Sequence, residues 1–77
     1  MEQKEFIKNF AAQFDETEVS VFTMETRFRE LDEWSSLNAL AILNMIGKKY
    51  CVILKPEDMK KTNTIQELFD LVKSYTN

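Results

Sequence analysis

The 77-residue chain contains no histidine, and only one cysteine, one glycine and one proline. Without histidine, and with a single thiol, it cannot build the Cys/His clusters that hold zinc or iron, and it lacks the commonest general base. One cysteine also cannot close an intramolecular disulfide, on which many small secreted domains depend. Scarce glycine and proline leave little turn chemistry for β-hairpins. We therefore expect a helical protein with no metal site.

Long apolar runs are also missing. The longest stretch without a charge, residues 34–47, has 14 residues, whereas a membrane-spanning helix needs ~20. The first residues, Met-Glu-Gln-Lys-Glu, lack the cationic and apolar regions of a signal peptide. A chain of this length buries only about 60% of the surface that it exposes when unfolded. The sequence thus predicts one small domain, residues 1–77, in a cytoplasmic protein.

Charge is unevenly distributed along the chain. The formal net charge is −3, with nine acidic and four basic residues in residues 1–35 and four acidic and six basic residues in residues 36–77. A net acidic chain lacks the basic face that nucleic-acid binding requires. Acidic residues concentrate in residues 15–33, which we interpret as a solvated connection.

Apolar residues recur at helical spacing in four segments, and we expect helices over residues 3–14, 36–50, 56–61 and 64–74. Ser35 is a natural N-cap for the second helix, and Pro56 suits the first position of the third. Thr64 and Glu67 form a capping box at the start of the fourth. Residues 15–35 show no sustained period, apart from one possible helical turn that includes Phe28. The predicted fold is an all-α four-helix bundle with a long loop between helices 1 and 2.

The expected second helix has two apolar faces. Projection at about 100° per residue places Ala39, Leu40, Leu43, Ile46, Gly47 and Tyr50 on one side, which we expect to face the core. The opposite side then carries Leu37, Asn38, Ala41, Asn44, Met45, Lys48 and Lys49. We also expect Cys51, which follows this helix, to be a small buried hydrophobic residue.

Ser35 and Ser36 stand between the acidic loop and the most apolar helix. A serine at this position is usually only a helix cap. However, the N-terminus of a helix offers unpaired N–H groups and the positive end of the helix dipole, which suit a phosphate. A serine here is well placed to carry a phosphodiester. It is poorly placed to act as a nucleophile, because no base accompanies it in the sequence.

Residues 28–37, Phe-Arg-Glu-Leu-Asp-Glu-Trp-Ser-Ser-Leu, resemble the segment around the Asp-Ser-Leu motif of acyl carrier proteins and peptidyl carrier domains. The resemblance continues through the helix that ends at Tyr50, then through Val-Ile-Leu-Lys-Pro-Glu-Asp-Met and Thr-Ile-Gln-Glu-Leu, and covers about residues 28–72. It implies a four-helix bundle that is not an enzyme. A phosphopantetheinyl transferase attaches 4′-phosphopantetheine from coenzyme A to the motif serine of such carriers.

Ser36, directly before Leu37, matches the modified serine, and Ser35 stands where the family usually has aspartate. Ser35 can replace the capping role of that aspartate but not its charge, and a minor alternative is that Ser35 itself is modified. The resemblance implies that the arm carries acyl or aminoacyl groups as thioesters between partner enzymes, such as a ligase or ketosynthase. The pathway can be fatty-acid, polyketide or another specialised biosynthesis, and we expect a monomer.

The resemblance also implies an apolar interior that in some family members opens to shelter the acyl chain. The residues expected to line it are Phe28, Leu40, Leu43, Ile46, Tyr50, Leu54, Met59 and Leu68. For each of them, a plain core role is the alternative.

Carriers of this family usually present an acidic second helix to basic patches on their partners. Here that helix has no acidic residue and ends in Lys48 and Lys49. We therefore expect partner docking through apolar contacts and flanking charges, and the candidates are Leu37, Ala41, Met45, Glu33 and Lys48. This departure favours a dedicated pathway over general fatty-acid synthesis. The rival hypothesis is an unmodified helical adaptor that binds a partner through the same outward face.

Overall fold

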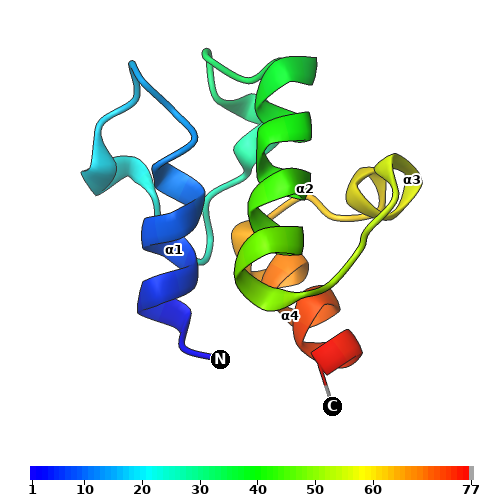
Figure 1. Ribbon diagram of the computed structural model, residues 1–77. Helices are drawn as coiled ribbons and strands as arrows, with labels where there is room; N and C mark the ends of the chain where they lie inside the picture. The colour runs from blue at the N-terminus through cyan, green and yellow to red at the C-terminus, as the bar shows by residue number, and fades with distance from the viewer. Residues whose placement is uncertain (77) are drawn as a thin grey trace.

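The computed structural model describes residues 1–76. Within them, four α-helices follow in the order α1 (Gln3–Ala11), α2 (Ser36–Tyr50), α3 (Pro56–Lys60) and α4 (Ile65–Thr76). Two 3₁₀ turns, η1 (Val19–Val21) and η2 (Phe28–Glu30), interrupt the long connection between α1 and α2. Figure 1 shows α1 and α2 side by side, with α3 against the far side of α2. The predicted all-α fold with a long first loop is confirmed.

The helices lie where the sequence predicts them, with small differences at their ends. α1 ends at Ala11 instead of residue 14, because the N–H groups of Gln13 and Phe14 donate to carbonyls three residues back, in a tighter 3₁₀ geometry. The predicted capping box of α4 is present, since the N–H of Glu67 donates to Thr64 Oγ1 at 3.1 Å and the Glu67 carboxylate accepts from the N–H of Thr64 at 3.2 Å. No helix within residues 1–76 is long and apolar enough to cross a membrane.

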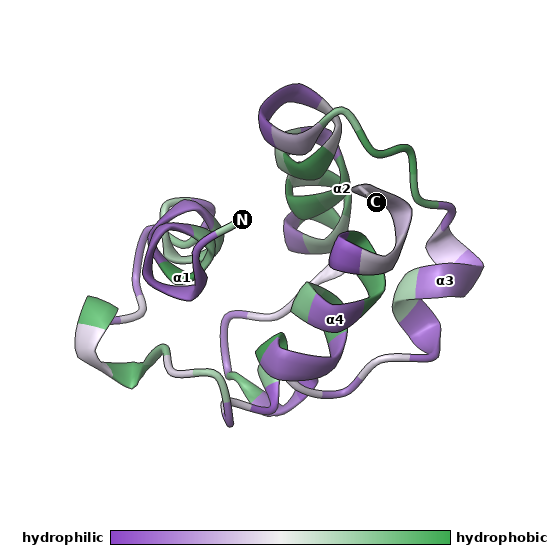
Figure 2. Ribbon diagram, turned by 90° about the horizontal axis from the view of Figure 1, so that it is seen from below, coloured by the Kyte–Doolittle hydropathy of each residue, from purple (hydrophilic) through white to green (hydrophobic). Residues whose placement is uncertain are grey.

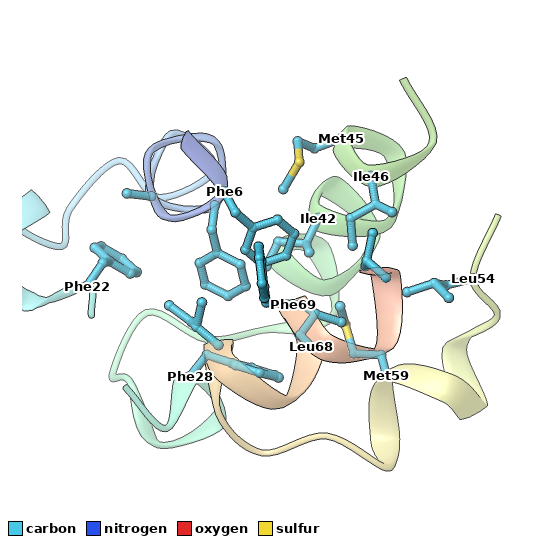
Figure 3. Close-up of a cluster of buried hydrophobic side chains, with 14 of the residues drawn as sticks. Phe6, Phe22, Phe28, Ile42, Met45, Ile46, Leu54, Met59, Leu68 and Phe69 are labelled. Carbon is cyan, nitrogen blue, oxygen red and sulfur yellow. The ribbon is translucent and has the colours of Figure 1, made fainter. Parts of the chain in front are cut away.

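Aromatic side chains form the centre of the core, as Figure 3 shows. Phe6, Phe10 and Phe28 are fully buried. The rings of Phe6 and Phe69 meet edge to face with centroids 5.4 Å apart, a favourable aromatic geometry. Because these residues come from α1, η2 and α4, their contacts join three segments that lie far apart in the sequence.

The long connection packs more tightly than a solvated segment. Phe22 and Met24 are buried, and the ring of Phe22 lies 5.1 Å from that of Phe14. The N–H of Gln66 donates to the carbonyl of Met24 at 2.8 Å, which ties the connection to the first turn of α4. The expected helical turn at Phe28 is confirmed. The interpretation of the whole connection as solvated was wrong, because Phe22, Met24 and Phe28 within it are buried, although most of its acidic residues are exposed.

α2 ends at Tyr50 and is followed by its C-cap, Cys51, whose backbone adopts the left-handed conformation with φ 56° and ψ 33°. Cys51 is the one non-glycine residue with positive φ in residues 1–76. The expectation that its side chain is buried was wrong, because Cys51 is exposed. The chain reverses direction at this residue, and Val52 and Leu54 enter the core in its place.

Candidate functional site

α2 buries a face that overlaps only in part with the one that we predicted, since Ile46 is buried as expected but Leu40 is not. Its buried residues are Asn38, Ile42, Met45 and Ile46. Leu40, expected in the core, is 56% exposed, and Met45, expected on the outward docking face, is only 6% exposed. Both predictions were therefore wrong. α2 is apolar on nearly every side, so the sequence pattern did not select one face, and contact with α1 and α4 did.

A short chain of hydrogen bonds fixes the N-terminus of α2. Ser35 Oγ donates to Asn38 Oδ1 at 2.8 Å, and Asn38 Nδ2 donates to the backbone carbonyl of Gln13 at 3.2 Å. Ser35 Oγ also accepts a longer bond, 3.4 Å, from the N–H of Asn38, so Ser35 is the predicted N-cap. Sequence reasoning placed Asn38 on the outward face. Its buried amide instead links the cap of α2 to the end of α1.

Ser36 is the first residue of α2 and is exposed. It is one of the residues that line a groove of about 570 Å³ between α2 and α3. The groove is mainly apolar, and its lining residues are Arg29, Trp34, Ser35, Ser36, Ala39, Leu40, Leu43, Pro56, Met59 and Lys60. The structure thus places the candidate serine among the lining residues of a groove that the sequence did not reveal.

Trp34 and Arg29, which were not among the candidate site residues, also line this groove. Trp34 packs on the ring of Phe28 with centroids 5.0 Å apart. Arg29 donates from Nη2 to the backbone carbonyls of Met59, at 2.8 Å, and of Thr62. These bonds hold the C-terminal end of α3 in place. No sequence signal could have identified them, because their acceptors are backbone atoms about 30 residues further along the chain.

The eight expected pocket residues separate into two groups. Leu40, Leu43 and Met59 line the groove. The others belong to the packed interior, namely Phe28, Ile46, Leu54 and Leu68, which are buried, and the half-buried Tyr50.

Tyr50 turns toward α1 rather than toward the groove. Its hydroxyl accepts a hydrogen bond from Asn9 Nδ2 at 3.0 Å, and its ring lies 5.6 Å from that of Phe6. Burial raises the pKa of the Tyr50 hydroxyl above its ordinary value. Tyr50 is therefore a contact between α1 and α2 and has no part in the groove.

The remaining docking candidates occupy different environments. Leu37 is 78% exposed, Lys48 is exposed and Ala41 is half-buried. Figure 3 shows Met45 beside Phe6 and Ile42, within the interior. The docking roles of Leu37, Ala41 and Lys48 stay predictions.

Glu33 has a structural task within the chain. Its carboxylate accepts hydrogen bonds from the Thr17 hydroxyl at 2.7 Å and from the backbone N–H groups of Asp15 and Glu16 at 2.8 and 3.0 Å. The hydrogen bond from Thr17, followed by those from the backbone, lowers the pKa of Glu33. Glu33 therefore links the loop after α1 to the segment before α2 by hydrogen bonds. Its docking role stays a prediction.

Two further hollows differ sharply in charge. One, of about 300 Å³, lies along the second half of α2 and is lined by Leu43, Asn44, Gly47, Lys48, Val52, Ile53 and Leu54. The other, of about 430 Å³, is formed by the long connection and is lined by Glu16, Thr17, Glu18, Val21, Leu31, Asp32 and Glu33.

Comparisons of this chain with protein-family models, with curated proteins and with solved structures find no match.

Proposed function

We propose that this chain is an acyl carrier protein that holds acyl or aminoacyl groups on a 4′-phosphopantetheine arm attached to Ser36. One observation carries the proposal. Ser36 is exposed, begins α2 and opens onto the groove between α2 and α3. A modifying enzyme can reach such a hydroxyl from solvent, and an attached arm can lie along the groove.

The residues around Ser36 fit a phosphodiester. The first N–H groups of a helix have no partner within the helix, and the positive end of the helix dipole favours an anion. Lys60 and Arg29 line the same groove as Ser36, and none of the described residues that line it is acidic. A phosphate on Ser36 would share this groove with two cationic residues, and the neutral Ser35 places no negative charge next to it. The arm supplies a terminal thiol, which holds the cargo as a thioester.

The groove suits the apolar part of such a cargo. Its volume of about 570 Å³ lies within the range of roughly 300–1,000 Å³ that is typical of small-molecule sites. Leu40, Leu43 and Met59 provide apolar contacts along it. In this proposal the protein performs no chemistry of its own. It is the substrate of a phosphopantetheinyl transferase and the partner of loading and processing enzymes in a fatty-acid, polyketide or other specialised pathway.

Intact mass spectrometry tests the proposal directly. The unmodified chain is incubated with coenzyme A, Mg²⁺ and a broad-specificity phosphopantetheinyl transferase, and Ser36→Ala and Ser35→Ala are treated in parallel. We expect the wild-type chain and Ser35→Ala to gain one phosphopantetheine unit and Ser36→Ala to gain none. A gain that disappears with Ser35→Ala alone would move the site to the other serine.

An unmodified helical adaptor is the second candidate. It is favoured by the exposure of two large apolar side chains one turn apart on α2, Leu37 at 78% and Leu40 at 56%, since exposed apolar groups mark protein-binding surfaces when they cluster. If no variant gains mass while a known carrier is modified in the same tube, this candidate replaces the first.

A further inference from the structure

The groove beside Ser36 and the hollow along the second half of α2 meet at Leu43, which lines both, and together they form a two-part surface. Apolar side chains are prominent on it, and Leu40 and Ile53 are 56% and 93% exposed. In Figure 2 the connection between α2 and α3, to which Ile53 belongs, is strongly hydrophobic. We define the α2–α3 face as Leu40, Leu43, Lys48, Ile53 and Lys60.

The charge on this face is opposite in sign to that of the whole chain. The residues that line its two hollows include Arg29, Lys48 and Lys60 and no acidic residue, although the net charge of the chain is −3. The acidic residues gather instead around the hollow of the long connection. Such a separation creates a local positive potential at the α2–α3 face, which selects partners by the sign of their charge.

Of the three cations, Lys48 and Lys60 are the ones available to a partner. Both residues are exposed. Arg29 is half-buried, and its guanidinium already donates to the carbonyls of Met59 and Thr62. Within residues 1–76, each of the two hollows therefore presents one exposed lysine to a partner, and the apolar side chain of Leu43 lines both hollows.

We propose that the α2–α3 face docks an acidic, apolar surface of the partner enzymes. One apolar side chain of the partner packs between Leu43 and Ile53, while carboxylates of the partner face Lys48 and Lys60. The identification of the partner as a cargo-processing enzyme rests on the proposed function, but the chemistry of the face does not require Ser36 to be modified. The carriers that this sequence resembles bind basic patches on their partners, whereas we expect the partner of this chain to present an acidic patch. Complementary charge speeds encounter and rejects partners of the wrong sign.

A peptide titration tests this docking chemistry. The probe is a synthetic amphipathic helix with leucines on one face and flanking glutamates, and its control has lysines in place of the glutamates. The unmodified ¹⁵N-labelled protein is titrated with each peptide and followed by NMR. We expect the amide signals of Leu40, Leu43 and Ile53 to shift with the glutamate peptide. We expect roughly tenfold weaker binding of the lysine peptide at low salt, and a smaller difference at high salt.

Two charge-reversed variants locate the effect. The double variant Lys48→Glu with Lys60→Glu should reverse the preference between the peptides. Its control, Lys4→Glu with Lys8→Glu on exposed positions of α1, changes the net charge equally and should leave the preference unchanged.

Three results would overturn the proposal. They are equal or tighter binding of the lysine peptide, absence of binding by the glutamate peptide, and an equal response of both double variants. Shifts of the same amides on addition of anionic lipid vesicles, without a response to the glutamate peptide, would identify a membrane surface instead. Because the protein is unmodified throughout, a failure here is distinct from a failure of Ser36 to gain mass.

Discussion

The orientation of α2 can be tested by shortening two of its side chains that are two residues apart. Ile42 is fully buried, whereas Leu40 is 56% exposed. Replacing a buried isoleucine by alanine costs about 2–5 kcal/mol, because transfer energy is lost and a cavity remains. Fully burying a leucine is worth about 1.5–3 kcal/mol, so a site that buries less than half of it stands to lose about 1 kcal/mol or less. We therefore expect Ile42→Ala to reduce the free energy of unfolding by about 3 kcal/mol, and Leu40→Ala by under about 1 kcal/mol.

Urea unfolding followed by circular dichroism measures both changes, and a constant slope of free energy against urea shows that the unfolded states remain comparable. In thermal unfolding, 1 kcal/mol corresponds to about 4–8 °C in a domain of this size. Met45→Ala should behave like Ile42→Ala, because Met45 is 6% exposed. If Leu40→Ala is as damaging as Ile42→Ala, or Met45→Ala is harmless, the packing face of α2 is the one that the sequence pattern suggested and our argument fails.

Three further changes test other parts of the structure. Cys51→Gly should raise the free energy of unfolding by about 0.5–1 kcal/mol, since glycine relieves the left-handed backbone, and an unchanged or lower urea midpoint would contradict this. Asn38→Ala should lower the free energy of unfolding by about 1–2 kcal/mol in thermal unfolding, because the carbonyl of Gln13 loses its hydrogen bond. A variant as stable as the wild type would show that this hydrogen bond does not stabilise the fold. The hydrogen bond from Thr17 holds the pKa of Glu33 below its ordinary value of 4.5 in the folded protein. The resulting stabilisation is complete above the unfolded-state pKa and is lost as the pH falls through the folded-state pKa. The free energy of unfolding of Glu33→Gln, measured in urea, should therefore fall less than that of the wild type as the pH falls below about 4.5. If the two proteins show parallel dependences of stability on pH, the Glu33 carboxylate does not stabilise the fold in this way.

Local chemistry made much of the fold predictable from the sequence. Helix starts follow from short-range signals such as Ser35, Pro56 and the pair Thr64 and Glu67, whose effects act within one turn. The position of Ser36 at the start of α2 was likewise predictable, because it depends on its neighbours in the sequence.

Other features depend on contacts between distant segments. The inward face of α2 was not predictable, because a helix that is apolar on several sides can bury any of them, and only the partners on α1 and α4 select Ile42 and Met45. The groove and the hydrogen bonds of Arg29 to α3 were equally unpredictable from the sequence, since they depend on where α3 lies against α2.

Sequence therefore determines the helices and the candidate serine of this protein, because caps and periodic apolar residues act over a few positions. Tertiary packing determines which side of α2 is buried, that Cys51 is exposed, and that Lys48 and Lys60 line two hollows that meet at Leu43. The physical reason is that burial and surface charge are properties of segments brought together in space, and their spacing along the chain does not encode them.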